Sequence, residues 1–293
     1  MERTVKRVVA VHDLSGFGRS SLAVVIPILA SMGIQACPLP TAVLSTHTGG
    51  FEKYRFLDLT DSMQGFIDHW TELGIEFDCV YSGFLGSSRQ IEILSTWISS
   101  FSLGDRKPLV VIDPVMGDDG KLYSSMSPEI VEKMREFVRK ADVITPNYTE
   151  AGFLLGENSG GLSLKKMKAW MEELSQMGPA TVIITSVPEE KTASRKSVVA
   201  YSRKDGRFWK AVFANIPVFY PGTGDAFTSV ITASLLQKDT LRIAIERAVR
   251  FLAAAIQASN SLSYPPREGI LLERFLPLLN RPILGKMNTR ELD

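Results

Sequence analysis

The 293-residue sequence predicts an α/β fold, with a doubly wound, mostly parallel sheet, helices on both faces and a short antiparallel addition near residues 197–216. Two observations predict it. Short apolar, β-branched runs alternate along the chain with longer segments of helical period. Most of these runs are continuously apolar instead of alternating with polar residues, which is typical of parallel strands covered on both faces.

The expected elements follow one another in a regular order. Strands are predicted at Lys6–Val11, Ile34–Leu39, Phe77–Ser82, Pro108–Asp113, Asp142–Thr145 and Thr181–Ser186. Between them, helices are predicted at Ser20–Met32, Leu57–Leu73, Ser88–Phe101, Pro128–Lys140 and Ser163–Met177. An antiparallel pair, Ser197–Tyr201 and Phe208–Ile216, is then expected around a Lys-Asp-Gly turn, followed by the helices Thr223–Leu236 and Leu241–Ala258. No repeat or long linker interrupts this order, so we expect one domain over residues 1–293.

Composition excludes several classes of protein. Lys plus Arg (33) nearly balances Asp plus Glu (32), so no strong field selects nucleic acid or an anionic membrane. The charged N-terminus does not resemble a secretory signal, and no apolar run is long enough to span a bilayer. Cys37 and Cys79 have no metal-ligand spacing and are expected to be buried thiols. We therefore expect a cytoplasmic protein that binds neither nucleic acid nor membrane.

The most informative segment is Pro221-Gly222-Thr223-Gly224-Asp225-Ala226-Phe227, which opens an apolar helix. Two glycines allow a ligand to approach the backbone closely, and free N–H groups at a helix start attract anions. A carboxylate beside such a site suits a base that takes a proton from an attacking hydroxyl. The alternative interpretation is a turn followed by a carboxylate that interacts favourably with the helix dipole.

Polar residues follow three neighbouring predicted strands. They are Asp113 and Asp118, then Thr145, Asn147 and Glu150, then Thr185 and Ser186. In open α/β sheets, ligands bind outside the carboxyl ends of the strands. Hard oxygen ligands near a phosphate-binding helix start indicate Mg²⁺ held between protein and nucleotide. For each acid singly, a role in a cap or turn is at least as good an interpretation.

Two further segments suggest a site for a small organic substrate. Gly16-Phe17-Gly18-Arg19-Ser20-Ser21 resembles a dinucleotide fingerprint, but it lacks the third glycine and the ribose-binding acid, which disfavours a dinucleotide-dependent oxidoreductase. We interpret it as a tight loop over the substrate. Leu44-Ser45-Thr46-His47-Thr48-Gly49-Gly50 offers hydroxyls and an imidazole that could hydrogen-bond a polar heteroaromatic ring, or it could form an exposed turn.

Taken together, these motifs resemble those of the ribokinase superfamily, and most closely its pyridoxal kinase branch. The G-T-G-D at 222–225 is similar to the anion hole and base of that superfamily. DPVMGD at 113–118, TPNYTE at 145–150, TS at 185–186, STHT at 45–48 and SGFLG at 82–86 are similar to motifs of the branch, in the expected order from about Val8 to Ala255.

The resemblance implies ATP-dependent phosphorylation of the 5′-hydroxymethyl group of pyridoxal, pyridoxamine or pyridoxine. It assigns Asp225 as the base and Gly222, Thr223 and Gly224 as the anion hole. Expected nucleotide contacts are Asp113, Asn147, Glu150, Thr185 and Ser186, and expected metal contacts are Asp118, Thr145 and Glu150. Expected substrate contacts are Asp13, Ser15, Thr46, His47, Phe84 and Asp225. ATP, Mg²⁺, a monovalent cation (K⁺ or Na⁺) and a homodimer are also implied.

The chain departs from the pyridoxal kinase pattern where the ring should bind. His12-Asp13 stands where a Gln-Ser pair is usual, and Phe84 stands where a tyrosine is usual. Asp13 would suit a cationic amine, which favours pyridoxamine. The short step from Asp13 to the helix beginning at Ser20 predicts that the strand lid of the sugar kinases is absent. A hydroxymethylpyrimidine kinase and a non-catalytic ligand-binding protein on the same fold remain as alternatives.

Overall fold

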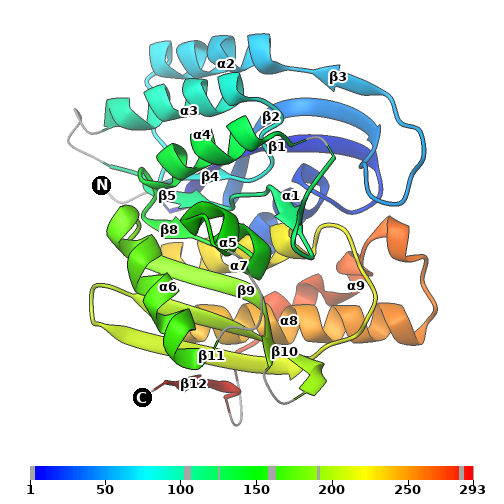
Figure 1. Ribbon diagram of the computed structural model, residues 1–293. Helices are drawn as coiled ribbons and strands as arrows, with labels where there is room; N and C mark the ends of the chain where they lie inside the picture. The colour runs from blue at the N-terminus through cyan, green and yellow to red at the C-terminus, as the bar shows by residue number, and fades with distance from the viewer. Residues whose placement is uncertain are drawn as a thin grey trace.

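A ten-stranded sheet forms the centre of the protein and confirms the predicted fold class (Figure 1). The structure, a computed structural model, describes residues 4–101, 107–124, 126–157, 163–189, 192–283 and 287–292. The strand order is β12-β11-β10-β9-β8-β5-β4-β1-β2-β3, and the strands from β9 to β2 in this order are parallel. The strands are β1 (Arg7–Phe17), β2 (Gln35–Thr46), β3 (Phe56–Asp58), β4 (Cys79–Ser82), β5 (Leu109–Ile112), β8 (Val143–Ile144), β9 (Thr181–Glu189), β10 (Thr192–Ser202), β11 (Arg207–Ala214) and β12 (Thr289–Glu291).

Helices cover both faces of this sheet, as Figure 1 shows. One apolar core packs the sheet against α2 (Thr60–Glu72), α3 (Ser88–Ser100), α4 (Pro128–Val138), α5 (Tyr148–Leu155) and α6 (Leu164–Met177). The other packs it against α1 (Leu22–Ser31), α7 (Thr223–Leu236), α8 (Leu241–Ser261) and α9 (Leu272–Phe275). Strand β1 explains the continuous apolar runs, because Val9 and Val11 enter the first core while Val8 and Ala10 enter the second.

The strands at both edges are antiparallel to their neighbours. The predicted pair around Lys204-Asp205-Gly206 is confirmed as β10 and β11. Strand β12, which was not predicted, pairs with β11 through three residues. In the segments of the chain that the structure describes, no helix has the length and apolarity needed to cross a bilayer.

One predicted helix start was wrong and one helix was missed. The helix expected from Leu57 begins at Thr60, because residues 56–58 pair with β2 as β3 and Asp58 accepts the Thr60 N–H at 2.6 Å. Helix α5 was not predicted. Its capping box joins Asn147 and Glu150, and it ends at Gly156, whose φ is 70°.

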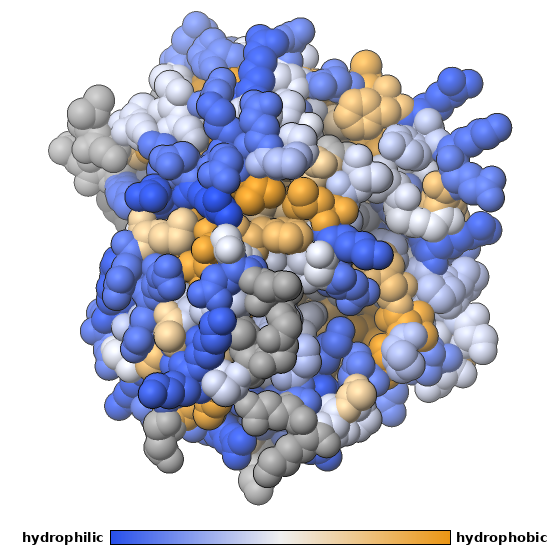
Figure 2. Space-filling view, viewed as in Figure 1, coloured by the Kyte–Doolittle hydropathy of each residue, from blue (hydrophilic) through white to orange (hydrophobic). Residues whose placement is uncertain are grey.

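Strands β1 and β2 continue beyond the rest of the sheet as a ribbon that β3 completes. The predicted tight loop at Gly16–Ser21 is therefore wrong in its first part, since β1 runs on to Phe17 and pairs with β2 up to Thr46. Along each strand of the ribbon, successive residues alternate between the two faces of the ribbon. Leu14, Val43 and Leu57 are register partners on the outer face, where all three are exposed. Figure 2 shows apolar side chains at the surface over β3, at the upper right.

Candidate active site

A cavity of about 840 Å³ lies at the carboxyl ends of the parallel strands, where α7 begins. The inner face of the ribbon contributes Leu44 and Phe56 to its wall. All of the predicted site residues except Ser15 and Thr46 line it, namely Asp13, His47, Phe84, Asp113, Asp118, Thr145, Asn147, Glu150, Thr185, Ser186, Gly222, Thr223, Gly224 and Asp225. Ser15 lies behind Asp13, and the hydroxyl of Thr46 is buried without a hydrogen bond to any described residue.

The turn into α7 depends on Gly222. Its φ is 78°, and a Cβ atom there would lie 2.3 Å from the carbonyl oxygen of Arg19. Both observations require glycine. The first backbone N–H groups of a helix have no partner within the helix, so this end of α7 offers donors and a partial positive charge to an anion in the cavity.

Asp225 lies in the first turn of α7 and is held on several sides. Its Oδ2 accepts the N–H of Ser21 at 2.8 Å, and its Oδ1 lies 3.5 Å from Nδ1 of His12. Its backbone carbonyl accepts the Ser229 hydroxyl at 2.6 Å. These contacts fix the carboxylate at the boundary between the Asp13 side of the cavity and the Asp113 side.

Ser21 connects the carboxylates of Asp13 and Asp225. Besides its N–H bond to Asp225, its hydroxyl donates to Asp13 Oδ1 at 2.5 Å, while Ser15 donates to Asp13 Oδ2 at 3.3 Å. Ser21 has a φ of 52°, an unfavourable conformation for a serine that the surrounding contacts must hold. Burial, and then the charge of Asp225, raise the pKa of Asp13. The Asp13 pocket therefore favours a ligand that supplies positive charge or a hydrogen-bond donor.

Arg19 ties the loop before Ser21 to the C-terminal part of the chain. Its guanidinium donates to both carboxylate oxygens of Glu273 at 2.9 Å and to the Tyr264 hydroxyl at 2.9 Å. Its N–H donates to the carbonyl of Glu268 at 3.0 Å. Because the Arg19 carbonyl also packs against Gly222, one residue fixes both the loop that orients Asp225 and the turn before it.

A second group of acids lies on the Asp113 side of the cavity. Burial, and then the charge of Asp225, raise the pKa of Asp113 to about 8. The Thr228 hydroxyl lies 3.3 Å from Asp113 and 2.9 Å from the Thr145 hydroxyl. Burial, and then the charge of Asp113, raise the pKa of Glu150 well above its usual range. The ligand-free site therefore resists carrying its full negative charge.

Glu150 also has a structural role. Its two carboxylate oxygens accept the backbone N–H groups of Met116 at 3.0 Å and Asn147 at 2.8 Å, and the Asn147 side chain accepts the Glu150 N–H in return. This capping box fixes the start of α5 against the Asp113 loop. For Glu150, the cap interpretation is thus confirmed.

The carboxylate oxygens around this part of the cavity fit a divalent cation whose other ligands would be phosphate oxygens and water. Among the described residues, no group of three His, Cys, Asp or Glu side chains could hold a metal ion by itself. Even so, Asp113, Asp118 and Glu150 line one part of the cavity, and burial raises the pKa of all three carboxyl groups. A bound cation would offset the charge that burial disfavours.

Asp118 lies on a small hairpin, β6 (Gly117–Asp118) and β7 (Lys121–Leu122), beside the acids. A Cβ atom at Gly117 would lie 2.2 Å from the carbonyl of Lys121, so the strands can meet only with glycine there. The turn is tethered by the Gly120 N–H, which donates to the Thr149 hydroxyl at 2.9 Å. The Asn147 side chain also donates to the carbonyl of Gly117 at 2.7 Å, so α5 holds the hairpin at the cavity wall, which Asp118 lines.

His47 does not offer free polar atoms to a ligand. Its Nε2 lies 2.7 Å from the carbonyl oxygen of Arg267, and its Nδ1 accepts the Gly49 N–H at 3.1 Å. This pattern requires a neutral ring with the proton on Nε2. The imidazole therefore shapes the wall of the cavity, and the hydrogen bond to substrate that its sequence context suggested would have to replace one of these contacts.

Lys196 and Thr228, which line the cavity, were not predicted as functional residues, and the contacts of His12 and Ser21 with Asp225 were not predicted either. Thr228 could have been found, because it lies one helical turn after Asp225 and so shares its face. Lys196 alternates with Val198 along β10, and both line the cavity. The contacts of His12 and Ser21 join distant parts of the chain and had no local signal.

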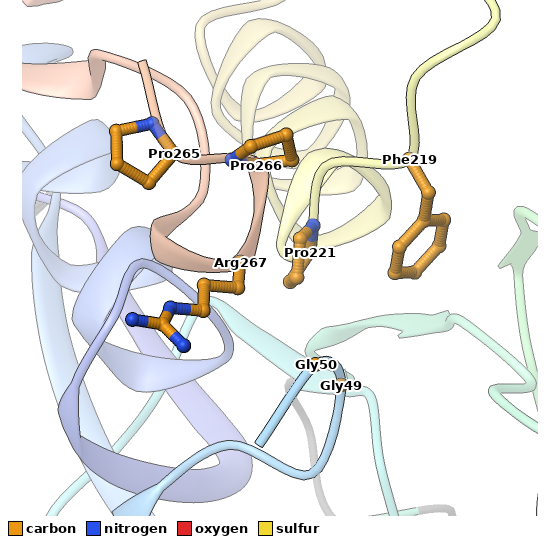
Figure 3. Close-up of a pocket in the computed structure, with 7 residues that line it drawn as sticks. All are labelled: Gly49, Gly50, Phe219, Pro221, Pro265, Pro266 and Arg267. Atoms are coloured by element: carbon orange, nitrogen blue, oxygen red, sulfur yellow. The ribbon is translucent and has the colours of Figure 1, made fainter.

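A second, more open hollow of about 470 Å³ adjoins the mouth of the cavity, with which it shares Gly49, Phe219 and Pro221. Figure 3 shows Phe219 and Pro221 on the segment that enters α7, facing Pro265, Pro266 and Arg267 on the C-terminal segment. The Arg267 guanidinium is turned away and lies 5.4 Å from the ring centroid of Phe51. This hollow is an apolar approach to the site rather than a second polar one.

Comparisons with known proteins agree with this geometry. A family model described as phosphomethylpyrimidine kinase matches residues 26–267. A candidate phosphomethylpyrimidine kinase from Bacteroides thetaiotaomicron, crystallised with pyridoxal, is 48% identical, with a TM-score of 0.94 over 99% of this chain and 100% of that one. The pyridoxal kinase of Lactobacillus plantarum is 28% identical, with a TM-score of 0.84 over 94% and 97%. A pyridoxine/pyridoxal/pyridoxamine kinase of Bordetella avium is 28% identical over 271 residues, 85% of this chain and 84% of that protein.

Proposed function

Because the chain belongs to the phosphomethylpyrimidine kinase family, we propose that it is an ATP-dependent kinase that phosphorylates the 5′-hydroxymethyl group of pyridoxal, pyridoxamine or pyridoxine. One observation carries the proposal. Asp225 stands in the first turn of α7, between a helix start suited to phosphate and a pocket bounded by Asp13 and Phe84. The crystallisation of a 48% identical relative with pyridoxal supports the choice of substrate.

In the proposed reaction, the γ-phosphate of ATP lies against the N–H groups at Gly222–Gly224. Asp225, oriented by Ser21, accepts the proton of the substrate hydroxymethyl group as its oxygen forms a bond to γ-phosphorus. The bond between that phosphorus and the β–γ bridging oxygen breaks, which leaves ADP. The other products are the phosphorylated vitamer and a protonated Asp225.

Mg²⁺, when bound, would neutralise phosphate charge, and Asp113, Asp118, Thr145 and Glu150 are the residues proposed to face it. The role of a monovalent cation stays a prediction. Lys196, together with Thr185, Ser186 and Asn147, is proposed to contact nucleotide phosphates, since all four line this side of the cavity. The apolar side chains of Val249, Leu252 and Ile256 line the same cavity and suit the adenine ring.

On the substrate side, the ring of Phe84 is proposed to pack on the pyridine ring, and Asp13 to accept a hydrogen bond from the substrate. Ser15 would act through Asp13, to which it donates a hydrogen bond. Thr46 stays a predicted contact, although its side chain does not line the cavity.

One assay separates the candidate activities. ADP release is measured by a coupled reaction with pyridoxal, pyridoxamine, pyridoxine and hydroxymethylpyrimidine as acceptors, at saturating MgATP. We expect turnover with at least one of the three vitamers. Turnover with hydroxymethylpyrimidine alone would favour the pyrimidine kinase, which the family description also allows. Binding of vitamers without turnover in any arm would favour a non-catalytic ligand-binding protein.

We further propose that the protein forms a homodimer through the outer face of the ribbon, where Leu14, Val43 and Leu57 form an exposed apolar row across three strands. Substitution of Val43 by Glu should convert dimer to monomer in sedimentation, while Lys204→Glu on the β10–β11 turn serves as a control. A monomeric parent protein would reject this assembly.

We also propose that residues 1–293 form one kinase domain, because β1 and β12 belong to the same sheet. The cytoplasmic compartment stays a prediction.

A further inference from the structure

The imidazole of His12 lies behind the proposed base and outside the cavity wall. The side chain is fully buried, and its Nδ1 is 3.5 Å from Oδ1 of Asp225. The edge of its ring meets Tyr81, with 4.5 Å between the centroids and 78° between the planes. Neither ring nitrogen makes a hydrogen bond to any described residue. A buried imidazole without a formed hydrogen bond is costly, so its presence beside a carboxylate requires an explanation.

The surroundings are shaped to admit this ring. A Cβ atom at Gly83 would lie 2.2 Å from Cε1 and 2.3 Å from Nδ1 of His12, so glycine is required where β4 ends. The register of β1 against β2 shifts between His12 and Leu14, and Asp13 occupies the irregularity. As a result, His12 and Asp13, although adjacent in the chain, approach Asp225 from the back and from the cavity side respectively.

The groups around the ring leave Asp225 as its natural partner. The titratable groups that face His12 are Asp13 on its own strand, Tyr81 on β4 and Asp225 on α7. Asp13 already accepts two hydroxyl hydrogen bonds, and Tyr81 presents its ring, while its hydroxyl lies 3.4 Å from the carbonyl of Asp225. Oδ1 of Asp225 lies 3.5 Å from Nδ1, and a small movement would form the bond.

We propose that His12 is a positioning residue for Asp225, with its Nδ1–H directed at Oδ1 while the Ser21 N–H holds Oδ2. Donors on both oxygens fix the plane of the carboxylate. Each oxygen keeps a lone pair, so one remains for the substrate hydroxyl. This inference rests on the proposed function, because it assigns His12 a part in orienting the base of that reaction. It also explains why no polar atom of His12 reaches the cavity.

Kinetics of two variants of matched size test the role. His12→Gln keeps a side-chain N–H donor, whereas His12→Leu fills the space without one. With the vitamer that the parent protein phosphorylates, His12→Leu should lower kcat by roughly 10- to 100-fold, because a small misplacement of a catalytic group has an effect of that size. The KM for ATP should stay within about twofold of the parent value. His12→Gln should recover most of the lost kcat. His69→Leu, on the exposed face of α2, is the control for loss of an imidazole.

A double-mutant cycle and a spectrum separate positioning from packing. In the Asp225→Asn background, the effect of His12→Leu on the residual kcat should largely disappear, because there is no carboxylate left to orient. Equal kcat in the parent, Leu and Gln proteins, each with a normal melting temperature, would overturn the proposal. So would losses in both variants that follow melting temperature alone, because a packing role predicts them.

Imidazole ¹⁵N NMR gives a readout that needs no turnover. The chain has three histidines, so the His12 signals are assigned by their loss in His12→Gln. They should report a proton on Nδ1, and they should shift when Asp225 is replaced by Asn. Unchanged signals would overturn the inference even if vitamers are phosphorylated. A clear shift in a protein that phosphorylates no vitamer would retain the His12–Asp225 contact and reject the proposed function instead.

Discussion

Replacement of Asp225 by Asn is the most direct perturbation of the proposed chemistry. The amide has the same size as the carboxylate, and its carbonyl oxygen can still accept the Ser21 N–H that Oδ2 accepts at 2.8 Å. The bond from Ser229 goes to the backbone carbonyl and is unaffected. What the variant loses is the negative charge and the ability to take a proton.

The expected magnitudes follow from these contacts. Turnover should fall by roughly 10² to 10⁴, the contribution of a positioned base, which corresponds to about 3–5 kcal/mol in the barrier. Affinity for ATP should hold or increase, because a charge that faces the phosphates and also raises the pKa of Asp113 is gone. The loss of a carboxylate from the first turn of α7 should lower stability by at most about 1 kcal/mol.

Three measurements on one protein decide the outcome: kcat in the ADP-release assay, ATP affinity by calorimetry, and melting temperature. Asp61→Asn is the matched control, because it removes an exposed carboxylate from the first turn of α2, away from the cavity. It should change stability slightly and turnover not at all. If folded Asp225→Asn protein keeps a near-parental kcat, Asp225 is not the base and the mechanism proposed above is wrong.

Four further outcomes are expected. Gly222→Ala should lose both turnover and ATP affinity, since its Cβ would clash with Arg19, whereas Gly206→Ala, which has a φ of 69° and open space, should show only the backbone strain of about 1 kcal/mol in its melting curve. With a folded-state pKa near 8, Asp113 binds a proton in the ligand-free fold that the unfolded chain releases near pH 4, so stability should fall as pH rises from about 4 to 8. Asp113→Asn should reduce that decline, to which Asp13, Asp118 and Glu150 still contribute through their own raised pKa values, and should gain up to about 5 kcal/mol at pH 8 by denaturant titration; an undiminished decline in the variant would contradict it. Asp118→Ala should raise the Mg²⁺ concentration needed for half-maximal turnover, and an unchanged titration would leave Asp118 as a turn residue only. Amide hydrogen exchange in the β6–β7 hairpin should slow when an ATP analogue and Mg²⁺ bind, and unchanged exchange would assign closure to another segment.

Much of the site followed from topology that the sequence could reveal. Parallel strands bring their carboxyl ends to one edge, so residues that follow β5, β8 and β9 had to lie close together once the alternation of strands and helices was recognised. The start of α7 was predictable because glycines and an acid stood before a long apolar helix. For Glu150, the spacing from Asn147 is that of a capping box, so the cap role that was weighed beside a metal role also had a signal in the sequence.

Other features depend on contacts that no local pattern encodes. The continuation of β1 to Phe17 depends on pairing with β2, which overrides the preference of Gly16 for a turn. Ser21 bonds to Asp225 from a loop that Arg19 ties to the C-terminal segment, and both contacts join distant parts of the chain. His12 likewise lies 3.5 Å from Asp225, a residue more than 200 positions later in the sequence, and no local pattern indicates that approach.

The ribbon formed by β1, β2 and β3 has a consequence for variation among related chains. Along β2, Val43 faces outward and its neighbour Leu44 faces the cavity. Adjacent codons therefore determine two independent properties, the outer surface and the fit to a ligand, and each can change by point substitution without affecting the other. A single-residue insertion or deletion is different, because it would turn every following side chain to the opposite face at once. Relatives should accordingly differ in this segment by substitutions and conserve its length.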